Sequence, residues 1–64
     1  MARIRRGGYI FVTWKGDHPP FHVHVYRDSE LVVKWDLEHD VPMVGAAPPA
    51  VLRLIAALRA EGDL

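Results

Sequence analysis

Apolar and polar side chains alternate along three segments in the first part of the chain. These segments, rich in β-branched and aromatic residues, are residues 9–15, 21–26 and 30–37. A repeat of two is typical of strands with one buried face. Between the first two segments, Pro19 and Pro20 lack the backbone donor that a continuous strand needs. The pattern therefore predicts three antiparallel strands separated by a loop and a turn.

A helix is predicted for residues 48–62, near the end of the chain. Pro48 and Pro49 suit a first helical turn, where a missing donor has no cost, and Gly62 suits a C-terminal cap. Apolar residues recur between them at helical spacing: Val51, Leu54, Ile55 and Leu58. Upstream, residues 41–45 predict a short edge strand that contains a proline. We therefore predict an α+β fold, an antiparallel sheet of three to four strands with one C-terminal helix packed on one face.

The alternation also predicts which side chains the helix covers. The predicted core face consists of Ile10, Val12, Trp14, Val23, Val25, Leu31, Val33 and Trp35. The predicted second face consists of Tyr9, Phe11, Thr13, His22, His24, Tyr26, Val32, Lys34 and Asp36. Because directly paired residues point to the same side of a sheet, a three-residue connection at residues 27–29 is expected, with Val25 opposite Leu31. Trp14 and Trp35 are then packing residues.

Composition favours a single small domain that has a partner. The 64 residues divide into an N-terminal arm (1–8), the sheet (9–45) and the helix (48–62). Half of the residues are hydrophobic, although a chain this short buries only about 60% of the surface that its unfolded form exposes. This excess favours a homodimer or a partner protein. The absence of cysteine excludes disulfides and thiolate-bound zinc.

Charge is balanced overall but uneven along the chain. Eight Lys and Arg residues match eight Asp and Glu residues, which argues against a strongly basic nucleic-acid-binding protein. Arg3, Arg5 and Arg6 precede the first acid and predict a basic arm, which Gly7 and Gly8 separate from the sheet. No apolar run is long enough to span a membrane and no signal-peptide core is present, so a cytoplasmic location is expected.

Three histidines within seven residues form the main candidate site. His22 and His24 are two apart on one strand and share a face, and His18 lies in the preceding loop. The three imidazoles could bind zinc. Alternatively, Asp17, His18, His22 and His24 could supply the proton acceptor and donor of a catalytic site. They could also be polar sheet residues, with Asp17 as an ordinary turn residue.

The predicted second face could also bind RNA. Exposed rings can stack on unpaired bases while cations contact phosphates. The candidate residues are Tyr9, Phe11 and Tyr26 for stacking, and Arg5, Arg6 and Lys15 for phosphates. A solvent-exposed face with scattered aromatic residues is the alternative interpretation, since antiparallel sheets commonly leave one face in water.

The histidine segment resembles a known sequence signature. It reads Asp17-His18-Pro19-Pro20-Phe21-His22-Val23-His24-Val25. This is similar to D-H-x-P-P-H-x-H-V, the pattern of short bacterial proteins of the domain of unknown function 4160 family. Phe21 stands where a second proline is usual. The Gly-Tyr-x-Phe-Val strand, the segment 34–37, the Pro42-Met43 pair and the final helix also resemble that family.

The resemblance implies a cytoplasmic bacterial protein that is often encoded beside another small protein, in an arrangement similar to toxin–antitoxin pairs. It implies no established reaction and no catalytic residues. Three hypotheses follow: a protein-binding module, a ribonuclease-like toxin that uses the histidine cluster, and a histidine-bound zinc site.

Overall fold

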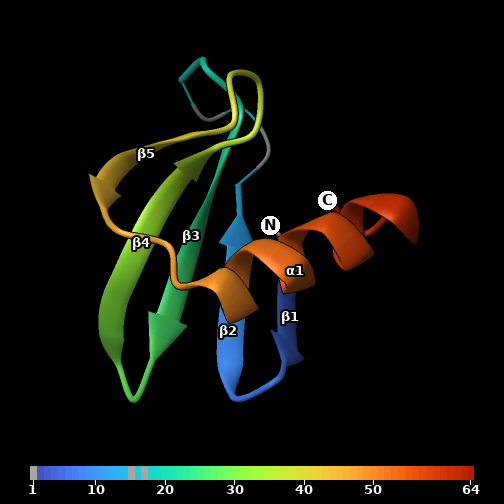
Figure 1. Ribbon diagram of the computed structural model, residues 1–64. Helices are drawn as coiled ribbons and strands as arrows, with labels where there is room; N and C mark the ends of the chain where they lie inside the picture. Colours follow the sequence, from blue (N-terminus) through green and yellow to red (C-terminus); the bar gives the residue numbers. More distant parts are fainter. Residues whose placement is uncertain (1, 15, 17) are drawn as a thin grey trace.

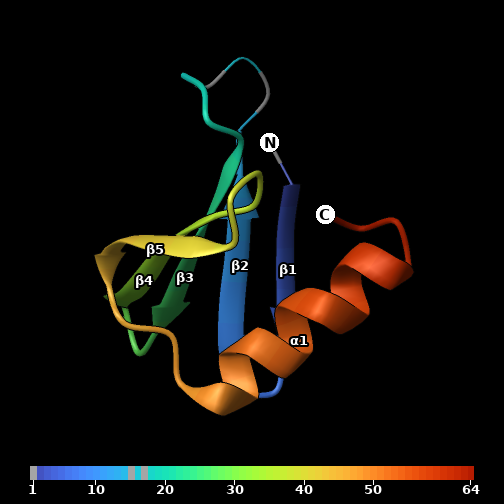
Figure 2. The same ribbon diagram turned by 45° about the horizontal axis from the view of Figure 1, so that its top comes forward.

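The computed structural model describes residues 2–14, 16 and 18–64, and contains a five-stranded sheet followed by one helix. The elements are β1 (Ala2–Arg6), β2 (Tyr9–Thr13), β3 (His22–Arg27), β4 (Glu30–Asp36), β5 (Val41–Gly45) and α1 (Pro49–Ala60). The strands are antiparallel and neighbour one another in chain order. Figures 1 and 2 show α1 lying across β2 and β1. The predicted α+β class and C-terminal helix are confirmed, but the predicted number of strands is too small.

The additional strand is β1, which lies where a basic arm was predicted. Ala2–Arg6 pairs with β2, with Arg3 opposite Val12 and Arg5 opposite Ile10. Gly7 and Gly8 have φ angles of 61° and 82°, the left-handed conformation that two-residue hairpin turns require. The two glycines therefore join a hairpin and do not release an arm.

The faces of β2 are the reverse of those predicted. Phe11 lies opposite Val25 and both are fully buried, so the side chains of Tyr9, Phe11 and Thr13 point toward α1. Trp14 is 39% exposed, and its expected role in the core is wrong. Trp35 does pack against the core, as predicted. Both faces of β2 are apolar, so the sequence has no contrast between polar and apolar positions that could identify the buried face. The large Phe11 ring fills the space beneath α1.

The connection between β3 and β4 also differs from the predicted three-residue turn. Asp28 and Ser29 form a two-residue turn with φ angles of 51° and 68°, and Arg27 lies opposite Glu30. The register then shifts, from Tyr26 opposite Leu31 to Val25 opposite Val33. The extra residue, Val32, forms a β-bulge, which lets a short turn coexist with correctly facing side chains. Leu31 consequently lies on the Tyr26 side and is 42% exposed.

The hydrophobic core lies between the sheet and α1. Its buried members are Tyr9, Phe11, Val23, Val25, Val33, Leu37, Val51, Ile55 and Leu58. The predicted helical face of α1 is thereby confirmed, with Leu54 partly buried against the same cluster. α1 ends at Ala60, and Gly62, the predicted C-terminal cap, follows with a φ of 82°. Hydrogen bonds from Gly62 N–H to the Arg59 carbonyl (3.1 Å) and from Asp63 N–H to the Leu58 carbonyl (2.8 Å) complete a Schellman motif.

Among the described residues, two exposed ion pairs connect α1 and the residue that follows it to the sheet region. Arg6 at the end of β1 contacts Glu61 at 2.6 Å, and Arg59 contacts Asp40 at 2.8 Å. The hydrogen bond from Arg6 lowers the pKa of the Glu61 carboxyl below its ordinary value. Residues 2–14, 16 and 18–64 contain no helical segment with the length and hydrophobicity of a membrane span.

Candidate functional site

The side of the sheet opposite α1, here called the open face, carries the candidate functional residues. Strand pairing places two rows of side chains across it. The first row is Arg3, Val12, His24, Lys34 and Val44. The second row is Arg5, Ile10, Tyr26 and Leu31. Neighbouring members of a row lie on adjacent strands, about 5 Å apart. The rows therefore begin with Arg3 and Arg5 at the β1 edge and end with the apolar Val44 and Leu31 on β5 and β4, and Lys34 lies beside Val44.

Aromatic rings surround His24 at the centre of the open face. The Trp14 ring meets the His24 ring edge-on at 4.7 Å, and the Tyr26 ring lies nearly parallel to it at 6.4 Å. The ring centres of His22 and His24 are 5.1 Å apart. The period of two in β3 predicted that these two imidazoles share a face, and the structure places them there. Lys34 lies directly opposite His24 on β4.

His22 is more buried than a solvent-facing catalytic histidine would be. It is 5% exposed, and its Nδ1–H donates to the Pro20 carbonyl at 2.7 Å. This hydrogen bond fixes the ring against the loop that contains the cis Pro19–Pro20 peptide bond. His18 is exposed in the same loop. The predicted candidates Asp17 and Lys15 lie outside the described residues.

Asp36 and His39 form a polar contact that sequence reasoning missed. The Asp36 carboxylate accepts hydrogen bonds from the backbone N–H groups of Glu38 (2.8 Å) and His39 (3.0 Å), and from His39 Nδ1–H (2.8 Å). Burial raises the pKa of Asp36, but the hydrogen bonds from His39 and Glu38 outweigh it, so the pKa lies below its ordinary value. Phe21 N–H also donates to the Glu38 carboxylate.

This contact gives Asp36 a structural role. It lies opposite His22 in the ladder, but its oxygens are engaged by the turn that follows β4, so it anchors that turn. An aspartate three residues before a histidine, at the start of a turn, is the sequence signal for such a contact.

The structure separates the residues expected to bind RNA. Tyr9 and Phe11 are buried in the core, so the expectation that they are exposed for stacking is wrong. Arg6 contacts Glu61. Tyr26 and Arg5 do lie on the open face, half-buried and exposed respectively.

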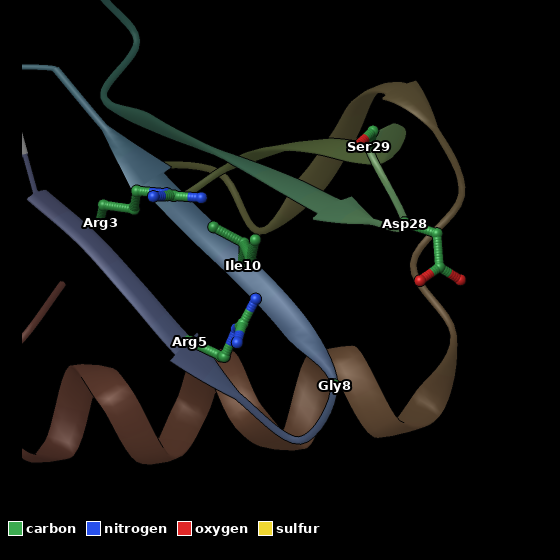
Figure 3. Close-up of a pocket in the computed structure, with 6 residues that line it drawn as sticks. All are labelled: Arg3, Arg5, Gly8, Ile10, Asp28 and Ser29. Atoms are coloured by element: carbon green, nitrogen blue, oxygen red, sulfur yellow. The ribbon is translucent and has the colours of Figure 1, made fainter.

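Arg3, which was not among the predicted binding residues, lines a cavity with Arg5 and Ile10. This cavity has a volume of about 310 Å³. A second cavity, of about 410 Å³, continues from it toward Gly8, Asp28 and Ser29. Figure 3 shows both guanidinium groups directed toward Ile10, with the Asp28 carboxylate at the far end. The alternation of Arg3 and Arg5 around Ile4 is the signal that would have placed them on one face.

The histidine segment shows no convergent metal site in the part of the chain that the structure describes. Among these residues, no group of three His, Asp or Glu side chains could hold a metal ion. Zinc binding by His18, His22 and His24 stays a prediction, which elemental analysis of the purified protein tests.

The fold and its open face define a small α+β protein with a five-stranded meander and one covering helix. A family model described as "Domain of unknown function (DUF4160)" matches residues 8–62. The chain belongs to this family. Searches of curated proteins and of solved structures gave no match.

Proposed function

We propose that this protein is a protein-binding module that contacts its partner through the β4–β5 edge of the sheet. Seven large hydrophobic side chains are exposed in the described part of the chain, and four of them belong to these two strands. The four, here called the apolar edge, are Leu31, Val41, Met43 and Val44. This concentration is the observation that carries the proposal, because clustered exposed apolar residues mark interaction surfaces.

The position of β5 supports the same function. β5 is the last strand of the sheet, and all five of its residues are exposed. An exposed apolar edge strand favours contact with another chain. Pro42 lacks a backbone donor, so an added strand could not form a complete ladder there. The interface is therefore built mainly from side chains.

The partner in this proposal is a small protein encoded beside this one. It presents an apolar surface to the apolar edge, as in the toxin–antitoxin-like arrangement expected from the family resemblance. A bacterial source and a cytoplasmic location belong to the same proposal. A second copy of this chain is the other occupant that the apolar edge could accept.

Light scattering after size-exclusion chromatography tests the proposal, with the protein alone and mixed with its genomic neighbour. We expect a complex that Val44→Glu abolishes and Leu52→Glu preserves. Leu52 is a matched control because it is an exposed hydrophobic residue on α1. A wild-type protein that stays monomeric and does not bind the neighbouring protein would contradict the proposal. Equal effects of Val44→Glu and Leu52→Glu on complex formation would also contradict it.

A ribonuclease-like toxin is the second candidate. The observation in its favour is the position of His24, whose ring centre lies 5.1 Å from that of the buried His22, with Lys34 opposite His24 on β4. Such a group contains a proton acceptor, a proton donor and a cation for a scissile phosphate. We expect growth arrest on expression that His24→Ala and Lys34→Ala relieve while the circular dichroism spectrum stays native. Unchanged toxicity in folded variants would remove these residues from the mechanism.

A further inference from the structure

We propose that Arg3 and Arg5 bind the phosphate backbone of a single-stranded nucleic acid, and that Tyr26 stacks on one of its bases. The surface formed by Arg3, Arg5 and Ile10 is here called the cationic edge. It lies at β1, across the sheet from the apolar edge. This proposal goes beyond the protein-binding function, and either one can fail without the other.

The two arginines are arranged for phosphate binding. Both are exposed and lie on the same face of β1, about 7 Å apart along the strand. The ion pairs of the described residues are Arg6–Glu61, Arg59–Asp40 and Asp36–His39, so no described carboxylate neutralises Arg3 or Arg5. A guanidinium group without a carboxylate partner is well suited to bidentate contact with phosphate oxygens.

The cavity beside these arginines gives the phosphates a place to lie. Its volume is about 310 Å³, and its lining residues are Arg3, Arg5 and Ile10. The apolar Ile10 side chain lies where both guanidinium groups point (Figure 3). Asp28, the acidic residue of the adjoining cavity, lies at the opposite end from the arginines. The local charge of the cationic edge is therefore positive although the net charge of the chain is zero.

Tyr26 extends the surface from phosphates to bases. It lies beyond Ile10 in the row that begins with Arg5, about 10 Å from β1. Its ring is half-buried and nearly parallel to the His24 ring. An uncovered sheet face that combines cations with aromatic rings is a common platform for single-stranded nucleic acids. This platform binds without sequence specificity, because every base has a face that can stack.

Fluorescence anisotropy with a labelled single-stranded RNA of about 12 nucleotides tests the proposal. We expect Arg3→Ala/Arg5→Ala to weaken binding by about tenfold or more, since two charge-assisted contacts are lost. Arg53→Ala/Arg59→Ala removes the same charge from α1 and is the matched control. We expect Tyr26→Ala to weaken binding about fivefold or more, and Tyr26→Phe to retain it.

Salt dependence provides a second readout. Each phosphate contact to a single strand contributes about −0.7 to the slope of log K against log salt concentration. The slope for the wild type should therefore be more negative than that for Arg3→Ala/Arg5→Ala by about 1.4. The α1 control should keep the wild-type slope.

Several outcomes would overturn the proposal. These are equal effects of the two double substitutions, no RNA binding by the wild type, and duplex RNA bound as tightly as the single strand. Displacement of the RNA by inorganic phosphate at a concentration equal to that of the RNA would show that the cavity binds a free anion. This result would also overturn the proposal. The proposal would also be overturned if Arg3→Ala/Arg5→Ala lost its binding to the partner protein and no RNA binding were detected.

Discussion

Phe11 on β2 lies directly opposite Val25 on β3, and both side chains are fully buried beneath α1. Truncation of Phe11 therefore leaves a cavity in the centre of the core. We expect Phe11→Ala to lower the free energy of unfolding by about 3–5 kcal/mol. Trp14→Ala is the control: it removes a larger side chain that is 39% exposed, and we expect a smaller loss. Urea unfolding of both variants measures the difference, and a larger loss in Trp14→Ala would contradict the observed faces of β2.

The hydrogen-bonded carboxylate of Asp36 should make the folded protein less stable in acid. Its pKa is lower in the folded protein than its ordinary value, because His39 and Glu38 donate hydrogen bonds to the carboxylate, despite the opposing effect of burial. Its stabilising contribution is therefore present above about pH 4 and is lost as the pH falls through the lower folded-state pKa.

Asp36→Asn is the variant that tests this contribution. We expect its free energy of unfolding to fall less steeply than that of the wild type below about pH 4. Glu61, whose pKa the Arg6 hydrogen bond lowers, retains part of the pH dependence in both proteins. Asp28→Asn removes an exposed carboxylate in the β3–β4 turn and is the control. Identical acid profiles for Asp36→Asn and the wild type would show that Asp36 is not held as described.

Gly45 ends β5 at a position that only glycine fits. Its φ is 77°, and a Cβ there would collide with the Val32 carbonyl oxygen. Gly62 has a similar φ of 82° but open space around it. We expect Gly62→Ala to cost about 1–2 kcal/mol from backbone strain alone, and Gly45→Ala to cost more. Thermal unfolding compares them, and an equal loss in both would mean that β5 can move away from β4 at little cost.

Regular alternation predicted the parts of the fold where polar and apolar positions differ clearly. In β3, the imidazoles of His22 and His24 alternate with Val23 and Val25, and both faces were assigned correctly. The face of α1 was likewise predicted from Val51, Ile55 and Leu58, and the cap from Gly62. Strong contrast between adjacent positions makes such a prediction possible.

The failures occur where that contrast is absent. β2 is apolar on both sides and both Phe11 and Val12 are buried, so which of them faces α1 depends on packing volume. In β1, the arginines lie on the open face of a paired strand, whereas their charge predicts an arm. The β4 bulge at Val32 is a tertiary adjustment between turn geometry and face alternation. For these reasons the candidate binding residues differ from those predicted. Arg3 lies on the open face and is added, whereas Tyr9 and Phe11 are buried in the core and are excluded.

Thiol accessibility distinguishes the covered face from the open face, because the chain has no cysteine and each single substitution introduces one thiol. Ile10 lies on the open face beside Arg5, whereas Val25 is fully buried beneath α1. Under native conditions, the thiol of Ile10→Cys should react with a disulfide reagent readily, and that of Val25→Cys only at the rate of unfolding. Rapid reaction at position 25 with protection at position 10 would place the helix on the other side of the sheet.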